Sequence, residues 1–280
     1  MRVATVLGAG GFIGRALVAR LRAEGRNVNA VTRADLPEFL ALCRPAGDVF
    51  YCIGLTADFR TRPLATAEAH CGLVARVLSE VFFNSFLLLS STRVYGRAEI
   101  GREELPLTVQ PGAADDLYNI TKLAGEALCL SDPRPAVRVA RLSNVYGEGM
   151  GTGSFLGQIL AEGDARGAVM LRQSLRSTKD YIAISEVVPA LLAIADRGEA
   201  RLYNVASGVN TTHDAIAGVL RNALGWDISA HANAAATRFP RIDIARLSVE
   251  FGPPRNRILD DLPEMARSPH TASLQQEPVC

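Results

Sequence analysis

The chain has 280 residues, of which 48% are hydrophobic and 21% are charged, and its formal net charge is +1. No basic surplus points to a nucleic-acid partner, and no acidic surplus points to disorder. No apolar run approaches the ~20 residues that span a bilayer, and the first residues lead directly into a glycine-rich motif, unlike a signal peptide. We therefore expect a soluble, cytoplasmic protein with no membrane and no nucleic-acid partner.

The cysteines are scattered along the chain. None belongs to a C-x-x-C pair, and no His/Cys cluster has the spacing of metal ligands. We expect no metal site and reduced thiols that pack as small apolar side chains. The five residues are Cys43, Cys52, Cys71, Cys129 and Cys280.

The first elements form a strand, a glycine loop, a helix and a second strand. Val3 to Leu7 is a short β-branched run typical of a buried strand. Gly8 to Gly14 follows, and apolar residues at helical spacing then continue to Gly25, a typical residue after a helix end. Val28 to Thr32 is predicted to be the second strand.

Further strands and helices alternate from there. We predict a strand at 48–53, a helix at 64–80, a strand at 85–89, a helix from Asp115 or Asp116 to about 130, and a strand at 137–142. Continuously apolar strands alternating with helices indicate a parallel sheet covered on both faces. The fold class is therefore α/β, a Rossmann-like doubly wound parallel sheet with a smaller C-terminal substrate lobe. The stretch from Arg33 to Gly47 holds at most a turn or so of helix and looks too short for a third strand.

After Gly147 repeated glycines interrupt the pattern. We predict a strand from Tyr181 to Ile184, a helix capped by Ser185, a strand from Leu202 to Val205, and a helix at 210–224. The expected division is a dinucleotide-binding domain at 1–147 with 181–206 returning to its sheet, a substrate lobe from 148–180 and 207–265, and a disordered tail at 266–280.

The glycine loop has the context of a dinucleotide site. Glycine permits a tight turn and a close approach of pyrophosphate to backbone N–H groups, and the positive N-terminal end of the next helix faces that anion. The alternative is a glycine-rich turn without a ligand. The predicted contacts are Gly8, Gly10, Gly11, Phe12, Ile13 and Gly14.

The end of the second strand favours NADP over NAD. An acidic residue there would accept a hydrogen bond from the ribose 2′-OH of NAD, whereas this chain has Thr32 and Arg33. A guanidinium can pair with the 2′-phosphate of NADP. Arg33 as a solvated surface residue is the alternative, and Asp35 lies close enough to leave NAD open.

Two later motifs, Ser90 to Gly96 (SSTRVYG) and Tyr118 to Lys122 (YNITK), complete a resemblance. With the glycine loop, and with the segments 141–147 and 179–182, the chain resembles the extended short-chain dehydrogenase/reductases over about residues 1 to 260. The most similar group is the NAD-dependent epimerase/dehydratase family, which acts largely on nucleotide-sugars. The resemblance implies a catalytic set of Ser91, Tyr118 and Lys122.

The chemistry of these residues agrees with that role. Tyr118 and Lys122 are four residues apart, so they share one helix face. A phenol has a pKa of ~10, and a nearby ammonium stabilises the phenolate, which then exchanges a proton with a substrate oxygen. Lys122 can also reach the ribose hydroxyls, and Ser91 can hold the substrate oxygen. An exposed Tyr/Lys pair and an ordinary serine turn are the alternatives.

Other residues follow from the resemblance. Gly54 and Thr56 are expected along the cofactor, and Thr92, Asn144 and Lys179 along the substrate, with Lys179 near its diphosphate. Arg172, Arg176 and Arg238 add charge or are solvated, and His70 and His213 are expected to be surface or helix residues. A homodimer through the tyrosine-bearing helix is expected by analogy.

The reaction type is narrowed by Thr92 and Arg93. The 4,6-dehydratases that this segment resembles carry an Asp-Glu pair there, which eliminates water, and neither a threonine nor an arginine replaces those carboxyls. We expect an epimerase or a ketoreductase. A reductase of a non-sugar carbonyl compound and a non-catalytic NADP-binding regulator stay open as alternatives.

Overall fold

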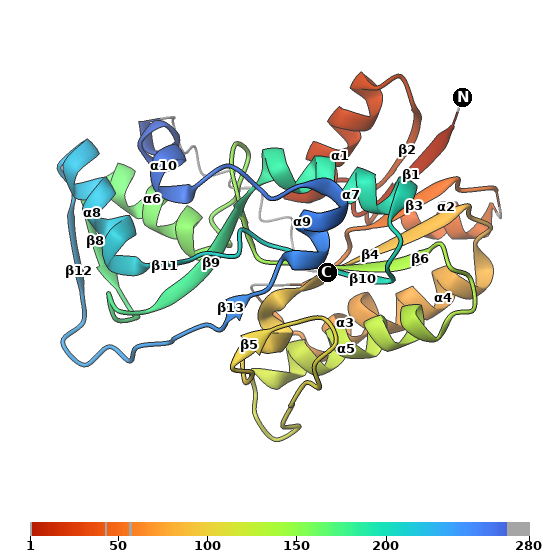
Figure 1. The fold of residues 1–280 in the computed structure, drawn as a ribbon. Helices are drawn as coiled ribbons and strands as arrows, with labels where there is room; N and C mark the ends of the chain where they lie inside the picture. The colour runs from red at the N-terminus through yellow and green to blue at the C-terminus, as the bar shows by residue number, and fades with distance from the viewer. Residues whose placement is uncertain (1, 43, 56–57, 268–280) are drawn as a thin grey trace.

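A parallel sheet of six strands carries the larger part of the fold, in the order β10-β6-β4-β3-β1-β2 (Figure 1). We describe it from a computed structural model, which describes residues 2–42, 44–55 and 58–267. The strands are β1 (Val3–Leu7), β2 (Asn27–Val31), β3 (Asp48–Tyr51), β4 (Ser85–Ser91), β6 (Val137–Leu142) and β10 (Leu202–Val205). The predicted doubly wound α/β fold is confirmed.

Helices cover both faces of this sheet, which is why its central strands are largely buried. On one face α1 (Phe12–Ala23) and α7 (Ile184–Arg197) pack on a core that includes Val6. On the other face lie α4 (Leu73–Glu80) and α5 (Asp116–Ser131). Figure 1 shows the two helix layers on either side of the strands.

The helix predicted at 64–80 is divided into three pieces. It begins as α3 (Pro63–Ala67), passes through a π-helical turn η1 (Glu68–Gly72) and continues as α4. A π turn adds a residue to the helical turn and changes the direction in which the following side chains point. As a result His70, within η1, is turned into the protein interior and is 1% exposed.

The sheet ends at β2, as the short segment after it predicted. Between Val31 and Asp48 the only regular element in the described residues is α2 (Leu36–Ala41). No strand from this segment pairs with the outer edge of β2 within the described part of the chain. The region where the adenine half of a dinucleotide would lie is therefore bordered by an edge strand.

A second body of structure is assembled from the later segments (Figure 1, left). Its sheets are β11-β9-β7 and β12-β8, and its helices are α6 (Phe155–Arg166), α8 (His213–Leu224) and α10 (Ile258–Arg267). The strands are β7 (Asn144–Tyr146), β8 (Ala168–Leu171), β9 (Thr178–Ala183), β11 (Asn210–Thr212) and β12 (Asp227–Ala230). A separate apolar core that includes Leu160, Leu220 and Leu262 holds it together.

Four short elements lie near the junction of the two bodies. The 3₁₀ turn η2 (Thr92–Tyr95) follows β4, and β5 (Ile100–Gly101) pairs with β13 (Arg241–Ile242). The helix α9 (Ala245–Phe251) packs beside β10, where Phe251 contacts Tyr203. The later segments therefore return to the large sheet as well as forming the smaller body.

Several expected boundaries differ from the structure. Of the range 181–206, β10 lies in the six-stranded sheet, whereas β9 pairs with β7 and β11. The expected helix at 210–224 begins as the strand β11, and α7 begins at Ile184 with no side-chain cap. The last helix includes Ala266 and Arg267, so the expected tail is wrong for these two residues, and 268–280 lie outside the described part.

Candidate active site

The glycine loop after β1 has the geometry of an anion cradle. Gly8 has φ +87°, and a Cβ there would lie 3.0 Å from the Cys52 carbonyl carbon. At Gly14 a Cβ would come within 2.2 Å of the Gly8 oxygen, so both positions require glycine. A Cβ on Gly10 would meet no described atom within 4 Å, which leaves open space above the loop. The N-cap of α1 is Gly11, which brings no side chain to its free N–H groups. The loop therefore fits a pyrophosphate.

The guanidinium of Arg33, just after the end of β2, forms no ion pair with any carboxylate of the described residues. The Asp35 carboxylate accepts hydrogen bonds from the Thr32 hydroxyl (2.6 Å) and from the Thr32 N–H (3.0 Å). Both bonds hold the pKa of Asp35 below its usual value, and the bond from the Thr32 hydroxyl has the larger effect. Asp35 thus binds the backbone turn instead of Arg33, whose side chain is exposed. The nearby carboxylate does not neutralise the cation by direct pairing.

Ser91, Tyr118 and Lys122 come together at the carboxyl end of β4. Ser91 is the last residue of that strand, and its hydroxyl lies close enough to Tyr118 to influence the phenol. Tyr118 and Lys122 lie on one face of α5 and are both buried, at 4% and 6% exposed, so they are not an exposed pair. Burial raises the pKa of Tyr118, and this rise is opposed by the Ser91 hydroxyl and by the charge of Arg93.

The Lys122 ammonium donates a hydrogen bond to the Leu89 carbonyl oxygen (3.0 Å) and lies 5.9 Å from the centre of the Tyr118 ring. Burial lowers the pKa of Lys122 to about 8, while the negative charge of Glu126 opposes that change. Glu126 is itself paired with Arg141 through a buried contact of 2.6 Å. The lysine is therefore a buried cation that is held against the end of β4.

His70 connects the Tyr118 helix to the loop after β3. Its Nδ1 lies 2.9 Å from the Thr121 hydroxyl, which donates to the Tyr118 carbonyl, so Nδ1–H is the donor of that contact. Its Nε2 accepts from the Leu55 N–H (3.2 Å). Burial, followed by the charge of Lys122, lowers the pKa of His70 to about 3, which keeps the ring neutral. His70 was expected to be a surface or helix residue. It does lie in a helical turn, but it is buried and connects two segments of the chain.

Gly54 lies directly beside this group. A Cβ there would stand 3.3 Å from both His70 Nε2 and Lys122 Nζ, so the backbone passes close to the lysine. Gly54 is therefore adjacent to the candidate site. Thr56 lies outside the described residues.

The expected substrate residues lie on both bodies of structure. Thr92 is buried in η2, whereas Asn144 is exposed and donates to the Asp180 carbonyl (2.8 Å). The Lys179 ammonium lies 4.2 Å from the centre of the Phe155 ring, and burial, followed by repulsion from Arg93, lowers its pKa to about 8. Lys179 has no ion pair with any described carboxylate. An anionic group placed there would relieve the repulsion between the two cations.

Two of the three candidate arginines of the smaller body share a cavity. Arg176 and Arg238 line a space of about 600 Å³ together with Thr178, Thr212 and Asp214. Arg172 is exposed and is not among the lining residues. His213, predicted as a surface or helix residue, begins α8, is 1% exposed and stacks on Phe155 at 4.2 Å.

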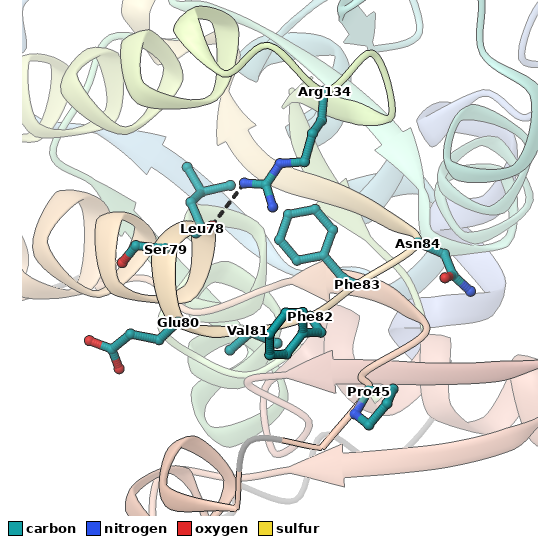
Figure 2. Close-up of a pocket in the computed structure, with 9 residues that line it drawn as sticks. All are labelled: Pro45, Leu78, Ser79, Glu80, Val81, Phe82, Phe83, Asn84 and Arg134. Carbon is teal, nitrogen blue, oxygen red and sulfur yellow. Dashed lines mark hydrogen bonds between the residues drawn. The ribbon is translucent and has the colours of Figure 1, made fainter.

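A second cavity lies far from these groups. It has a volume of about 370 Å³ and is lined by the segment 78–84 with Pro45 and Arg134. Figure 2 shows the Arg134 side chain across the Phe83 ring, with a hydrogen bond to the Leu78 carbonyl. Because Pro45 and Asn84 precede β3 and β4, this cavity is at the amino edge of the sheet. Ligands of open α/β sheets bind at the carboxyl edge.

The described residues contain neither a metal-binding cluster nor a membrane-spanning helix. No group of three or more His, Cys, Asp or Glu side chains is arranged to hold a metal ion there. In the same part of the chain, no helix has the length and apolar character needed to cross a membrane.

The glycine loop, the Ser91/Tyr118/Lys122 group and the doubly wound sheet together define a chain of the extended short-chain dehydrogenase/reductase class. A model of the NAD dependent epimerase/dehydratase family matches residues 4–206, and the chain belongs to that family of enzymes.

Individual relatives agree with this assignment. The dTDP-6-deoxy-L-talose 4-dehydrogenase (NAD(P)(+)) of Kitasatospora kifunensis is 30% identical over 238 residues, which cover 74% of each chain. Among solved structures, RMD from Pseudomonas aeruginosa complexed with NADPH has a TM-score of 0.80 at 24% identity, covering 95% of this chain and 98% of that one. MoeE5 in complex with UDP-glucose and NAD has a TM-score of 0.78 at 21% identity, covering 93% and 96%.

Proposed function

We propose that this enzyme transfers hydride between a nicotinamide dinucleotide and a sugar carbon of a nucleotide-sugar. The observation that carries the proposal is the placement of Ser91 at the end of β4 beside the buried Tyr118 and Lys122, at the same sheet edge as the glycine loop. A bound dinucleotide supplies the hydride acceptor or donor. Tyr118 exchanges the proton of the substrate hydroxyl, Ser91 holds that oxygen, and Lys122 holds the ribose hydroxyls and favours the phenolate.

We propose NADP as the preferred cofactor, with NAD as the alternative. The relatives named above include both an NADPH complex and an NAD complex, so the preference rests on Arg33. The residues that would hold the dinucleotide include the exposed backbone of the glycine loop, Thr32 and Arg33 at β2, Gly54 and Thr56 after β3, and the pair Tyr118 and Lys122.

For the substrate, we propose recognition across both bodies of structure. Thr92 and Ser91 contact the sugar, and Asn144 and Lys179 contact the sugar and the diphosphate. Arg176 and Arg238 contribute cations from the cavity beside β9. On this proposal residues 1–147 and much of 181–206 hold the dinucleotide, and the remaining segments hold the nucleotide-sugar. A homodimer stays a prediction.

The proposed reaction is epimerisation or reduction of a keto-sugar, not 4,6-dehydration. Thr92 and Arg93 replace the two carboxyls that elimination needs, because a threonine hydroxyl is a poor acid and a guanidinium does not deprotonate. The talose 4-dehydrogenase relative supports redox chemistry without elimination.

A substrate panel tests the proposal. The enzyme is incubated with NADP(H) or NAD(H) and UDP-, GDP-, CDP- and dTDP-linked hexoses or their keto derivatives, while cofactor absorbance and product stereochemistry are followed. We expect epimerisation or a stoichiometric change in cofactor absorbance with at least one of them. Release of a 4-keto-6-deoxy product from a plain nucleotide-hexose would contradict the reaction type. Turnover of simple carbonyl compounds alone would favour the non-sugar reductase, and dinucleotide binding without turnover would favour the regulator.

A further inference from the structure

Arg93 lies against the ring of Tyr118. It belongs to η2, two residues after Ser91, and its guanidinium carbon lies 5.1 Å from the centre of the Tyr118 ring and 4.7 Å from the centre of the Phe59 ring. The side chain is 34% exposed, so the charge is partly shielded from water by the two rings. A cation over an aromatic face in such surroundings interacts more strongly than one in bulk solvent.

The lysine of the candidate catalytic set has a different arrangement. Its ammonium is 5.9 Å from the centre of the same ring and is hydrogen-bonded to the carbonyl oxygen of Leu89. Of the two cations near Tyr118, the guanidinium is therefore the closer to the ring.

We propose that Arg93 is a second cation, besides Lys122, that stabilises the ionised form of Tyr118, and that its backbone N–H directs the Ser91 hydroxyl to the same oxygen. The inference rests on the proposed function, because it concerns the phenol that would exchange the substrate proton. On this proposal Arg93 makes the ionisation of Tyr118 easier and has no part in the elimination of water.

The Ser91 contact supports the second half of this proposal. The Arg93 N–H donates to Ser91 Oγ (3.2 Å), so that oxygen acts as an acceptor toward the backbone. The hydroxyl proton is then available for donation to Tyr118, whose pKa the Ser91 side chain holds down against the effect of burial. A hydrogen bond donated to the ionised phenol favours that form. Backbone and side chain of Arg93 thus act on Tyr118 in the same direction.

The other ionisable groups around Tyr118 do not cancel this effect. The His70 ring, 5.2 Å away, is neutral because both of its nitrogens are engaged. Asp116 is committed to Arg97 and to the Gln110 N–H. Asp115 is 61% exposed, pairs with Arg60, and is 3.9 Å from the Arg93 guanidinium, a separation that gives a weak surface pair.

Two further cations surround Arg93. Arg60 covers the same Phe59 ring at 4.5 Å without contacting Tyr118, and Lys179 on β9 is repelled by Arg93. The net charge that faces the phenol from η2 and its neighbours is therefore positive. This field adds to that of Lys122, which lies 5.9 Å from the centre of the ring.

The test measures the ionisation of residue 118 directly. A difluorotyrosine, whose phenol is more acidic than that of tyrosine, is placed at position 118, and its titration is followed by fluorine NMR with saturating NADP⁺. The comparison uses Arg93→Met, Arg93→Lys and, as a matched control, Arg60→Met. Circular dichroism at each pH shows whether a variant remains folded.

We expect Arg93→Met to move the titration midpoint to higher pH, Arg93→Lys to restore most of the shift, and Arg60→Met to leave the midpoint near that of the parent. An unchanged midpoint in folded Arg93→Met, or an equal shift in Arg60→Met, overturns the proposal. The titration needs no substrate, so failure of the nucleotide-sugar proposal leaves this result intact. Once a substrate is found, the acidic limb of kcat/KM should move in the same direction in Arg93→Met.

Discussion

Tyr118 is the residue on which the proposed chemistry depends, because its phenol is influenced by the Ser91 hydroxyl and its ring is enclosed by Phe59, His70 and Arg93. Tyr118→Phe keeps the enclosed ring and removes only the hydroxyl. We expect kcat to fall on the order of 10²–10⁴-fold, the usual contribution of a proton-transfer group. Dinucleotide affinity, measured by isothermal titration calorimetry, should stay close to that of the parent. Turnover near the parental rate would remove Tyr118 from the mechanism.

Lys122 links function to stability through its charge. Burial lowers its pKa to about 8 from the ordinary 10.5, so between these pH values the unfolded chain holds a proton that the folded chain has released. The folded state therefore gains stability as pH rises through this window.

Lys122→Met removes that linkage. At neutral pH the variant avoids burying a charge, and we expect it to be more stable than the parent by on the order of 1–2 kcal/mol after the loss of one hydrogen bond. The advantage should shrink as pH rises toward 10.5, and dinucleotide affinity and turnover should both fall. Thermal unfolding of the two ligand-free proteins across this range gives the comparison. A stability difference that does not change with pH would show that the ammonium is not desolvated.

Arg33 is expected to select the cofactor, because Asp35 is bound to Thr32 and leaves the guanidinium free to meet a 2′-phosphate. We expect NADPH to bind roughly tenfold more tightly than NADH, which corresponds to about 1.4 kcal/mol. Arg33→Ala should remove the difference without weakening NADH. Titration calorimetry with both dinucleotides decides, and equal affinities that Arg33→Ala does not alter would show that the residue is merely solvated.

At the scale of elements, the π turn η1 positions His70 between α5 and the loop after β3. His70→Phe keeps a ring in the buried space but leaves the Leu55 N–H and the Thr121 hydroxyl without this partner. We expect a loss of about 1–3 kcal/mol in the free energy of unfolding, the usual cost of unsatisfied buried groups. Faster hydrogen exchange of the Leu55 amide should accompany it.

Thr121→Val is the matched control for this element, because it removes the Nδ1 contact, together with the bond from the Thr121 hydroxyl to the Tyr118 carbonyl, and keeps the Nε2 contact with Leu55. It should destabilise the protein less than His70→Phe and preserve the protection of Leu55. If the Leu55 amide exchanges at the parental rate in His70→Phe, the histidine does not hold the loop.

The large sheet was predictable because its strands are buried on both faces. The runs rich in valine and leucine at Val3–Leu7 and Val137–Leu142 form β1 and β6 at their predicted bounds. The length of the segment after β2 likewise predicted the lack of a third strand there. The strand β11 was missed because Asn210, Thr211 and Thr212 carry no apolar pattern, and its pairing with β9 arises only in the tertiary structure.

The site was predictable in part for a similar reason. The motif spacing brought Tyr118 and Lys122 onto one helix face, and the burial of both is compatible with the proposed role. The surroundings of Tyr118 could not be read from spacing, because Phe59, His70 and Arg93 reach it from three separate segments. The π turn that directs His70 inward likewise leaves no signal in the hydrophobic pattern.

At the scale of the whole molecule, the account requires hydride to pass between the dinucleotide site on the large sheet and a sugar held by the smaller body. The most direct measurement uses NADPH that carries deuterium on the transferable position, mixed with a nucleotide-linked 4-keto sugar and analysed by mass spectrometry and NMR. We expect one deuterium in the product, bound to the carbon that bears the new hydroxyl, and no such deuterated product with Tyr118→Phe. Product that forms without deuterium at that carbon, or that forms equally well with Tyr118→Phe, would contradict it.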